Sequence, residues 1–260
     1  MDGVTESATN LLCTWPKTAL QELAEDVGMK LAVRSWGDGE RTALLVHGFS
    51  DDSTTWWRIG PALAERGWRV LAPDLRGHGA SDRAASYRLP DFAEDLAESV
   101  PAGAELALGH SLGAVALGLA VDRLCPRNSV FVDPPWFRLV PAHALEQPLP
   151  AARHQLPASW DDEDATTDLR SNALLAPEVS AALSRALSTK PALPPPAVGR
   201  AFVLVPENEP VLPPEARPVL ERLGYSVATQ PGVRHVVHRD DPEGFLAWVL
   251  ASVFGEELVV

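Results

Sequence analysis

The feature of this 260-residue chain that most constrains its fold is an alternation of short apolar segments with segments of helical spacing. Apolar runs predicted to be strands occupy residues 29–36, 43–46, 68–72, 105–108 and 129–132. Segments with helical periodicity lie between them at residues 59–66, 91–99 and 112–124. Parallel strands need crossover connections, which helices supply. The alternation therefore predicts an α/β fold, with a mostly parallel, doubly wound sheet flanked by helices.

The alternation breaks after Asp133 and resumes at Ala201. Between these points the chain is rich in Pro and Ala, and it has helical periodicity at 165–175 and 178–187. Two further strands, at 201–205 and 226–229, and two helices, at 215–223 and 242–253, follow. A helical insertion thus precedes the last two strands of a single domain.

The expected organisation has three parts. Residues 29–133 and 199–260 form the α/β core, and residues 134–198 form a helical lid, or cap, inserted into it. Residues 1–28 form an N-terminal extension with no assigned role, in which 18–26 has the spacing of a short helix.

The charge of the chain excludes some partners. A net charge of -13 repels phosphate, which argues against binding to nucleic acid or to an anionic membrane. The first ten residues are polar and acidic where a secretory signal would be basic and then apolar, so we expect a cytoplasmic protein. The two cysteines form no motif with metal-ligand spacing, and we expect neither metal nor cofactor. The oligomeric state is not predicted.

Reactive side chains follow several of the predicted strands. In an open α/β sheet, functional groups collect beyond the carboxyl ends of the strands. Those positions hold His47, Asp74, Ser111, Asp133, Glu207, Glu209 and, after the last strand, His235. This set contains a nucleophile, a base and an acid.

The serine lies in the sequence Gly109-His110-Ser111-Leu112-Gly113, between a predicted strand and a long predicted helix. The flanking glycines allow a sharp bend, which places Ser111 in a strained conformation with its hydroxyl exposed at the sheet edge. The Leu112 N–H opens the helix, where the helix dipole favours a developing oxyanion. This context is typical of a nucleophile elbow.

Four motifs carry a family resemblance: LLVHGF at 44–49, VLAPDLRGHGASD at 70–82, LGHSLGA at 108–114 and HVVHRDDPEGF at 235–245. In this order they resemble the α/β-hydrolase superfamily, and in particular its serine-nucleophile, lid-bearing, esterase- and lactonase-like branch. The resemblance covers roughly residues 29–133 and 201–253.

By that resemblance, the oxyanion hole consists of the backbone N–H groups of Phe49 and Leu112, and His47 braces the loop. His235 occupies the first position of the last motif, so we assign it the role of base in preference to His238.

The acid has three candidates, Glu209, Asp133 and, in third place, Glu207. The stretch at 202–215 resembles the family segment that carries the usual carboxylate, and it aligns Glu209 with that position. It departs from the pattern, because Pro206 stands where Gly is usual and Glu replaces Asp. Because of this alignment, and despite the two departures, we expect Glu209 to be the acid. Asp133, at the family's other acid position, is the alternative.

These roles imply a serine hydrolase that cleaves a carboxylic ester, lactone or thioester through an acyl-enzyme on Ser111. A serine at the elbow argues against epoxide hydrolase or dehalogenase chemistry, for which the family uses aspartate. The alternatives are a C–C bond hydrolase, a lyase or cyclase with the same triad, and a non-catalytic ligand-binding protein. Aromatic side chains near the motifs predict a small-molecule substrate with an apolar acyl or aryl group. The expected pocket residues are Trp56, Trp57, Trp136 and Trp160.

Overall fold

The computed structural model describes residues 29–141, 143, 145 and 156–256. The N-terminal extension, including the helix expected at 18–26, lies outside the described residues. Within the described part of the chain, no helix combines the length and the apolar character needed to cross a membrane.

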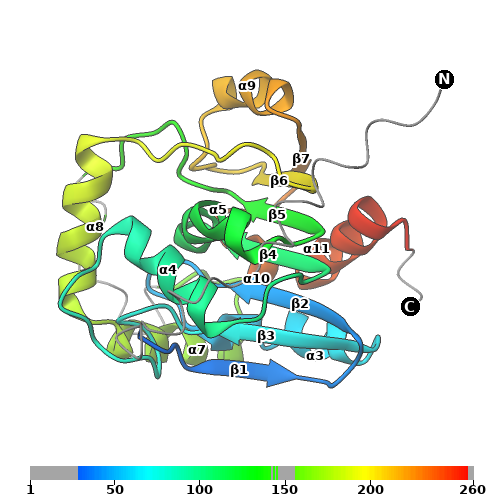
Figure 1. Ribbon diagram of the computed structural model, residues 1–260, viewed down its shortest axis with the longest axis horizontal. Helices are drawn as coiled ribbons and strands as arrows, with labels where there is room; N and C mark the ends of the chain where they lie inside the picture. The colour runs from blue at the N-terminus through cyan, green and yellow to red at the C-terminus, as the bar shows by residue number, and fades with distance from the viewer. Residues whose placement is uncertain (1–28, 142, 144, 146–155, 257–260) are drawn as a thin grey trace, which may run out of the picture.

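A seven-stranded sheet forms the centre of the molecule, in the order β1-β3-β2-β4-β5-β6-β7 (Figure 1). β1 pairs with β3 in antiparallel orientation, and all the other neighbours are parallel. The strands are β1 (Val33–Trp36), β2 (Arg41–Val46), β3 (Trp68–Pro73), β4 (Leu106–His110), β5 (Asn128–Val132), β6 (Arg200–Pro206) and β7 (Tyr225–Gln230). The predicted mostly parallel α/β sheet is confirmed.

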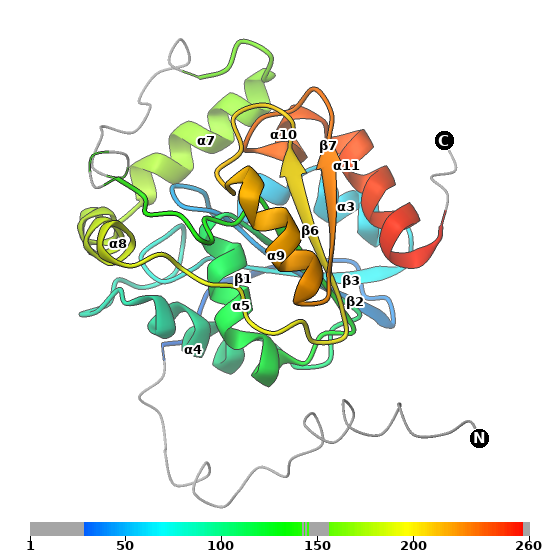
Figure 2. The same ribbon diagram turned by 90° about the horizontal axis from the view of Figure 1, so that it is seen from above.

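Helices cover both faces of this sheet (Figures 1 and 2). One face packs against α4 (Leu89–Ser99), α5 (Leu112–Leu124) and α9 (Arg217–Arg222), the last preceded by the 3-10 turn η3 (Pro214–Ala216). The other face packs against α3 (Ile59–Ala64), α11 (Pro242–Val249) and the π-helical turn η4 (Leu250–Phe254).

The side chains of β2 show why its sequence is apolar throughout. Leu44 and Val46 belong to the core on the α5 side, whereas Ala43 and Leu45 belong to the core on the α3 side. All four are buried, because successive side chains of a strand point to opposite faces and both faces are covered.

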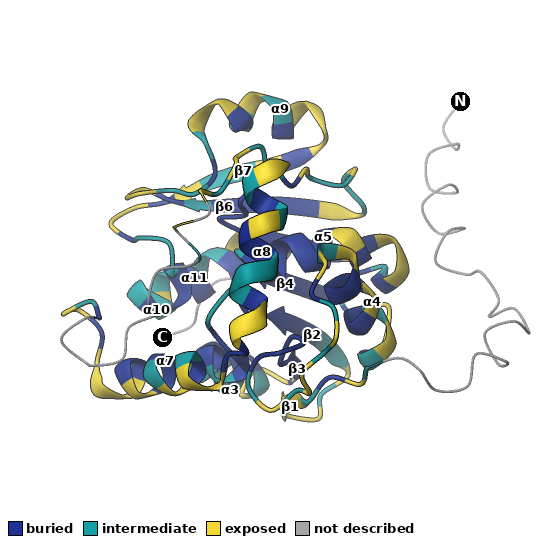
Figure 3. Cartoon of the chain, turned by 90° about the vertical axis from the view of Figure 1, so that its left-hand side faces the viewer, coloured by how far each residue is buried: buried dark blue, intermediate teal, exposed yellow. Residues whose placement is uncertain are grey.

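In the described part of the segment between β5 and β6, the chain forms α7 (Asp162–Leu174) and α8 (Pro177–Thr189). The helices expected at 165–175 and 178–187 are thus present. α7 begins three residues before its predicted start, because the Asp161 carboxylate accepts a hydrogen bond from the Asp164 N–H at 2.8 Å and caps the helix. Figure 3 shows α8 crossing in front of the sheet, with one side buried and the other exposed.

Two short elements were not predicted: η1 (Ser53–Trp56) and α10 (Val237–Asp240). Each contains four residues, which is too short for helical periodicity to show in the sequence. Side chains of both elements pack beside the candidate site.

Candidate active site

Ser111 lies at the sharp turn between β4 and α5. Its backbone has φ 50° and ψ -112°, a strained combination for a residue other than glycine. Gly113 makes the turn possible, since a Cβ atom there would lie 2.4 Å from the carbonyl oxygens of Val46 and His47. The turn predicted from the two glycines is therefore present, with Ser111 at its apex.

His235 lies in the loop between β7 and α10, and it contacts a carboxylate at the end of β5. Its Nδ1 atom is 2.6 Å from Oδ2 of Asp133. An ionised carboxylate only accepts hydrogen bonds, so the Nδ1 atom carries the proton and donates it. The Nε2 atom of His235 is then left unprotonated in the neutral ring, which is the form that a general base requires.

Asp133 is fully buried and is fixed on three sides. Its carboxylate accepts hydrogen bonds from the backbone N–H groups of Val211 and Leu212 at 3.0 Å, in addition to the bond from His235. Its φ of 41° turns the chain at the end of β5. The loop after β6 therefore orients a carboxylate that lies at the end of β5.

The structure corrects the expectation for the acid. Glu209, the carboxylate favoured from the sequence, is exposed, with φ 53°. It makes no hydrogen bond or ion pair with any residue that the structure describes. The loop after Pro206 instead directs two backbone N–H groups, those of Val211 and Leu212, toward the carboxylate of Asp133. Asp133, the alternative, is the residue that contacts His235.

Ser111 and His235 line one cavity of about 270 Å³. Phe49 and Leu112, the expected oxyanion donors, line it too. Leu112 is the first residue of α5, so its N–H has no partner within the helix. The loop that carries Phe49 lies against the elbow, because a Cβ atom at Gly48 would be 3.5 Å from Cβ of Ser111. The arrangement brings a hydroxyl, an imidazole and two N–H positions to one space.

None of the four tryptophans expected in the substrate pocket lines this cavity. Trp56 and Trp136 are fully buried in the core. The indole N–H groups of Trp57 and Trp160 donate instead to the carboxylates of Asp164 and Asp240. The apolar part of the cavity is formed by Leu112 and by aliphatic residues of the inserted segment and the loop after β6: Val140, Leu145, Leu183, Leu187 and Val211.

The other histidines near the site have structural contacts. His47 accepts a hydrogen bond from the Leu75 N–H at Nε2, 2.9 Å away, and so braces its loop as the resemblance implied. His238 is buried, stacks on Trp56 with 4.2 Å between ring centroids, and bonds to Thr55 Oγ1 at 2.8 Å. Burial holds the pKa of His238 well below 6.5, so the ring is neutral.

A buried ionic cluster lies beside the cavity. Arg239 donates to Asp51 Oδ1 at 2.8 Å, to Asp168 Oδ1 at 2.9 Å and to Thr55 Oγ1 at 2.9 Å. Asp51 and Asp168 also line the cavity. Sequence reasoning missed this cluster, and its only signals were the acidic run after Phe49 and the arginine that follows His238.

Asp51, His110 and His238 are the one group in the described part of the chain whose side-chain donors, within 4.8 Å of one another, suit a metal ion. The guanidinium of Arg239 lies 2.8 Å from Asp51, and its positive charge opposes a cation there. The donor set therefore fits a hydrogen-bonded ionic cluster better than a metal centre.

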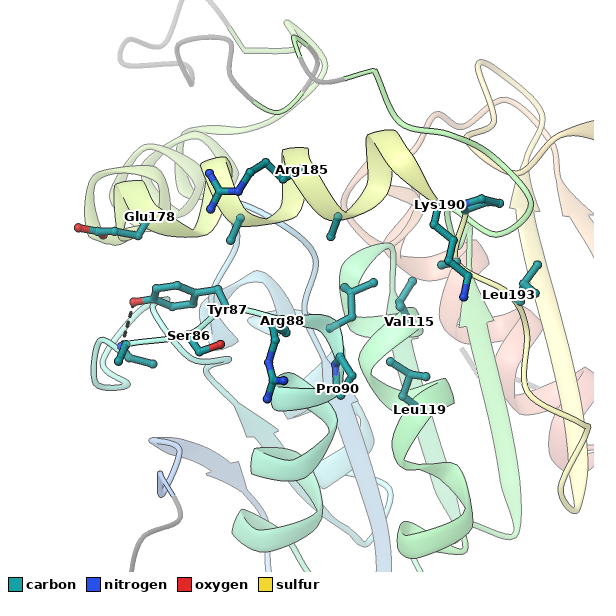
Figure 4. A pocket seen from close by; sticks show the side chains of 17 residues that line it. Ser86, Tyr87, Arg88, Pro90, Val115, Leu119, Glu178, Arg185, Lys190 and Leu193 are labelled. Carbon is teal, nitrogen blue, oxygen red and sulfur yellow. Dashed lines mark hydrogen bonds between the residues drawn. The ribbon is translucent and has the colours of Figure 1, made fainter.

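A larger groove, of about 930 Å³, borders another side of α8, between that helix and residues 84–90 (Figure 4). Its lining includes Tyr87, Leu119 and Arg185, and contains neither Ser111 nor His235. The groove is therefore separate from the site built around the elbow.

A family model described as the alpha/beta hydrolase family matches residues 43–248. The chain belongs to this family. The matched region contains the elbow, the oxyanion loop, His235 and Asp133, so the family assignment and the site geometry refer to the same part of the chain.

Curated relatives in the alpha/beta hydrolase family resemble only part of the chain. Epoxide hydrolase A of Mycobacterium tuberculosis is 36% identical over 104 residues, which are 37% of this chain and 32% of that protein. Polyneuridine aldehyde esterase of Rauvolfia serpentina is 31% identical over 121 residues, 44% of this chain and 46% of that protein. The chain thus spans about a third of the length of the mycobacterial relatives it matches.

Solved alpha/beta hydrolase structures match over most of their length. An esterase from Exiguobacterium antarcticum aligns with a TM-score of 0.70 and 17% identity, covering 87% of this chain and 96% of the esterase. E-2-(acetamidomethylene)succinate hydrolase aligns with a TM-score of 0.69 and 21% identity, covering 87% and 95%. These likenesses show the fold that the two chains share with this one.

Proposed function

We propose that this protein is a serine hydrolase that cleaves a carboxylic ester, lactone or thioester through an acyl-enzyme on Ser111. The observation that carries the proposal is the 2.6 Å contact between His235 Nδ1 and Asp133, beside a cavity that contains Ser111. This contact orients the imidazole and fixes its tautomer, which are the two requirements for a base that activates a hydroxyl.

In the proposed reaction, His235 Nε2 takes the proton of the Ser111 hydroxyl while its oxygen attacks the carbonyl carbon. The carbonyl oxygen becomes an oxyanion and accepts hydrogen bonds from the N–H groups of Phe49 and Leu112. The imidazolium then gives its proton to the leaving alcohol or thiol. Water, deprotonated by the same imidazole, attacks the acyl-enzyme and releases the acid and the free serine.

Asp133 stabilises the imidazolium that forms in each step, because its buried carboxylate accepts the Nδ1 proton without itself becoming protonated. The hydrogen bonds from Val211 and Leu212 hold that carboxylate in place. The role of acid in the triad therefore goes to Asp133.

The substrate is a small molecule that carries an apolar acyl or aryl portion. The cavity of about 270 Å³ is small, and Val140, Leu183 and Leu187 provide aliphatic walls. The described residues of the inserted segment between β5 and β6 act as a cap over the reaction, since they supply these walls. Relatives named esterases support ester cleavage. The elbow of this chain carries Ser111, whereas family members that open epoxides carry an aspartate at that position.

Hydrolysis of p-nitrophenyl acetate and butyrate by the wild type and by Ser111→Ala tests the proposal. We expect turnover by the wild type and a loss of about 10³-fold or more in kcat for the variant, with an unchanged melting temperature. Equal rates for the two proteins would refute the role of Ser111. No turnover of any ester, lactone or thioester by the folded wild type would refute the substrate class.

A further inference from the structure

Asp51 presents a carboxylate oxygen without a hydrogen-bond donor at the wall of the cavity that contains Ser111. Its side chain is only 6% exposed. Oδ1 accepts a hydrogen bond from Arg239 Nη2 at 2.8 Å. Among the residues that the structure describes, none donates a hydrogen bond to Oδ2, and the Nδ1 atom of His110 lies 4.0 Å from it. Because Asp51 lines the cavity, this oxygen is an acceptor that a molecule bound in the cavity can reach.

His110 cannot supply that donor. Its Nε2 atom is 2.9 Å from the carbonyl oxygen of His235 and donates to it, so the proton of the neutral ring is on Nε2. Burial holds the pKa of His110 well below 6.5, so Nδ1 stays unprotonated and is itself a buried acceptor without a partner. Two acceptors therefore lie side by side at the cavity wall.

The remaining members of the cluster are already engaged. Arg239 donates to Asp51 Oδ1, Asp168 and Thr55. Asp168 accepts hydrogen bonds at both of its oxygens, one from Arg239 and one from Asn172 at 2.8 Å. One guanidinium charge faces two carboxylates, so this side of the cavity is negative when both are ionised.

Asp51 is also close to the reacting groups. Its backbone N–H donates to the carbonyl oxygen of Gly48 at 3.4 Å, which closes a turn that includes Phe49. A Cβ atom at Gly48 would lie 2.7 Å from His110 Nδ1, and His110 directly precedes Ser111. The unpaired oxygen thus belongs to the same turn as one expected oxyanion donor and lies beside the neighbour of the nucleophile.

We propose that Asp51 is a specificity-determining residue whose Oδ2 atom accepts a hydrogen bond from a hydroxyl, amide N–H or ammonium group that the substrate carries near its scissile carbonyl. The inference rests on the proposed function and names a substrate class for it: esters, lactones or thioesters with a hydrogen-bond donor close to the reacting bond. Substrates with an anionic group at the same place are disfavoured, because the wall already carries negative charge.

Two matched pairs of esters test the proposal, one for each side of the scissile bond. Phenyl glycolate is compared with phenyl propanoate, and 2-hydroxyethyl butanoate with propyl butanoate. In each pair, kcat/KM of the hydroxyl-bearing ester is divided by that of its apolar partner. The quotient for the wild type is then divided by the quotient for a variant, which cancels the intrinsic reactivity of the esters.

The test variant is Asp51→Asn, and the matched control is Asp168→Asn. In the test variant, the new side-chain amide can keep its oxygen on Arg239 only by directing its NH₂ group, a donor, toward the cavity. We expect the preference for the hydroxyl-bearing ester to fall about tenfold or more in at least one pair. Asp168→Asn reduces the charge around Arg239 equally, but both oxygens of Asp168 are engaged, so the preference should change less than twofold.

The pH dependence of the same preference in the wild type provides a second measurement, which needs no variant. Burial raises the pKa of Asp51 to about 6, against the opposing effect of Arg239. The other groups that face it are Asp168 from α7, His110 from β4, His238 from α10, and His47 and Asp52 from its own loop region. Any effect of pH on the chemical step is common to both esters of a pair and cancels, so the preference should decline as the pH falls below about 6 and the Asp51 carboxylate takes up a proton.

Several results would overturn the proposal. They are an unchanged preference in Asp51→Asn, an equal loss in Asp168→Asn, or a wild-type preference that is constant from pH 5 to pH 8. If Asp51→Asn does not fold, the wild-type pH series decides alone. If the wild type cleaves p-nitrophenyl butyrate but none of the four esters, the substrate class inferred here is wrong and the proposed function stands. Failure on the p-nitrophenyl esters as well would count against the proposed function itself.

Discussion

The Nδ1 atom of His235 lies 2.6 Å from Oδ2 of Asp133, although 102 residues separate them in the sequence. The sheet makes this contact possible, because β5 and β6 are parallel neighbours and their carboxyl ends meet at the same edge. Asp133 follows β5, and the N–H groups that hold its carboxylate come from the loop after β6. The Asp133 carboxylate is therefore positioned by the segments that follow two neighbouring strands of the sheet.

Asp133→Asn should reduce kcat by about 10⁴-fold, because the amide leaves His235 in the wrong tautomer and removes the charge that stabilises the imidazolium. Glu209→Gln is the matched control. Since Glu209 is exposed and contacts no described residue of the site, its kcat should stay within twofold of the wild type. Hydrolysis of p-nitrophenyl butyrate measures both, and the reverse pattern would restore Glu209 as the acid.

His235→Asn and His238→Asn should separate a catalytic from a structural histidine. His235→Asn should lose about 10³-fold or more in kcat, because the variant lacks the general base. Its melting temperature should be unchanged, because the side chain of His235 is partly exposed and adds little to the packing of the core. His238→Asn should instead lower the free energy of unfolding by roughly 1–3 kcal/mol, since it removes a buried ring that stacks on Trp56. Urea unfolding and ester turnover measure the two effects, and an intact His235→Asn enzyme would contradict the assignment.

Gly113→Ala and Gly118→Ala, both in α5, should differ sharply in their loss of folding stability. A Cβ atom at Gly113 would lie 2.4 Å from two carbonyl oxygens of the β2 end, so the variant should lose about 3 kcal/mol of stability and most of its activity. At Gly118 the nearest atom is Cδ of Pro195, at 3.2 Å, and the gain in helix propensity offsets the tight contact. Its stability should change by about 1 kcal/mol at most. Similar losses in both variants would show that the elbow has no special need for Gly113.

The contribution of His78 to the free energy of unfolding should fall as the pH decreases from 6.5 to 4.5. Burial lowers the pKa of His78 to about 3, so the folded protein keeps it neutral while the unfolded chain binds a proton below pH 6.5. The unfolded state then holds more protons, and the contribution of His78 to the unfolding free energy declines by about 1.4 kcal/mol per pH unit in this window.

His78→Gln tests this prediction through the slope of unfolding free energy against pH, measured with urea. The slope should be smaller than that of the wild type by about one proton between pH 6 and pH 4.5. Asp51 opposes the trend in the wild type, because its raised pKa makes the folded state bind a proton earlier as the pH falls. That contribution is present in both proteins and cancels in the comparison. Identical slopes would contradict a neutral His78 in the fold.

Local sequence signals predicted much of the fold and the strained turn at Ser111. The bounds of α5, Leu112–Leu124, are those expected, because an apolar helix that begins directly after a glycine-flanked serine leaves few alternatives. The strained Ser111 was expected for the same local reason. These features depend on residues within a few positions of one another.

The acid and the pocket depend on contacts that no short stretch contains. Asp133 and Glu209 both follow a strand, and the choice between them rests on where Val211 and Leu212 fold back. Trp56 was expected in the pocket because it follows the oxyanion loop, but the unpredicted η1 turns it into the core.

The hydrogen bonds around Arg239 could not be predicted from nearby sequence either. The hydrogen bond between Arg239 and Asp51 joins residues 188 positions apart, and the one between Arg239 and Asp168 spans 71. No periodicity or motif specifies such pairs, because they form only when the sheet brings its connecting segments together.

Mass spectrometry of the protein after reaction with an alkyl fluorophosphonate directly tests whether Ser111 is a nucleophile that His235 activates. Phosphorus bonds to the Ser111 oxygen as fluoride leaves, and His235 takes the hydroxyl proton. We expect one adduct per wild-type chain, mapped to Ser111 by peptide sequencing, with no adduct on Ser111→Ala and a far slower reaction of His235→Asn. An adduct on another residue, or an unmodified folded wild type, would contradict this role of Ser111.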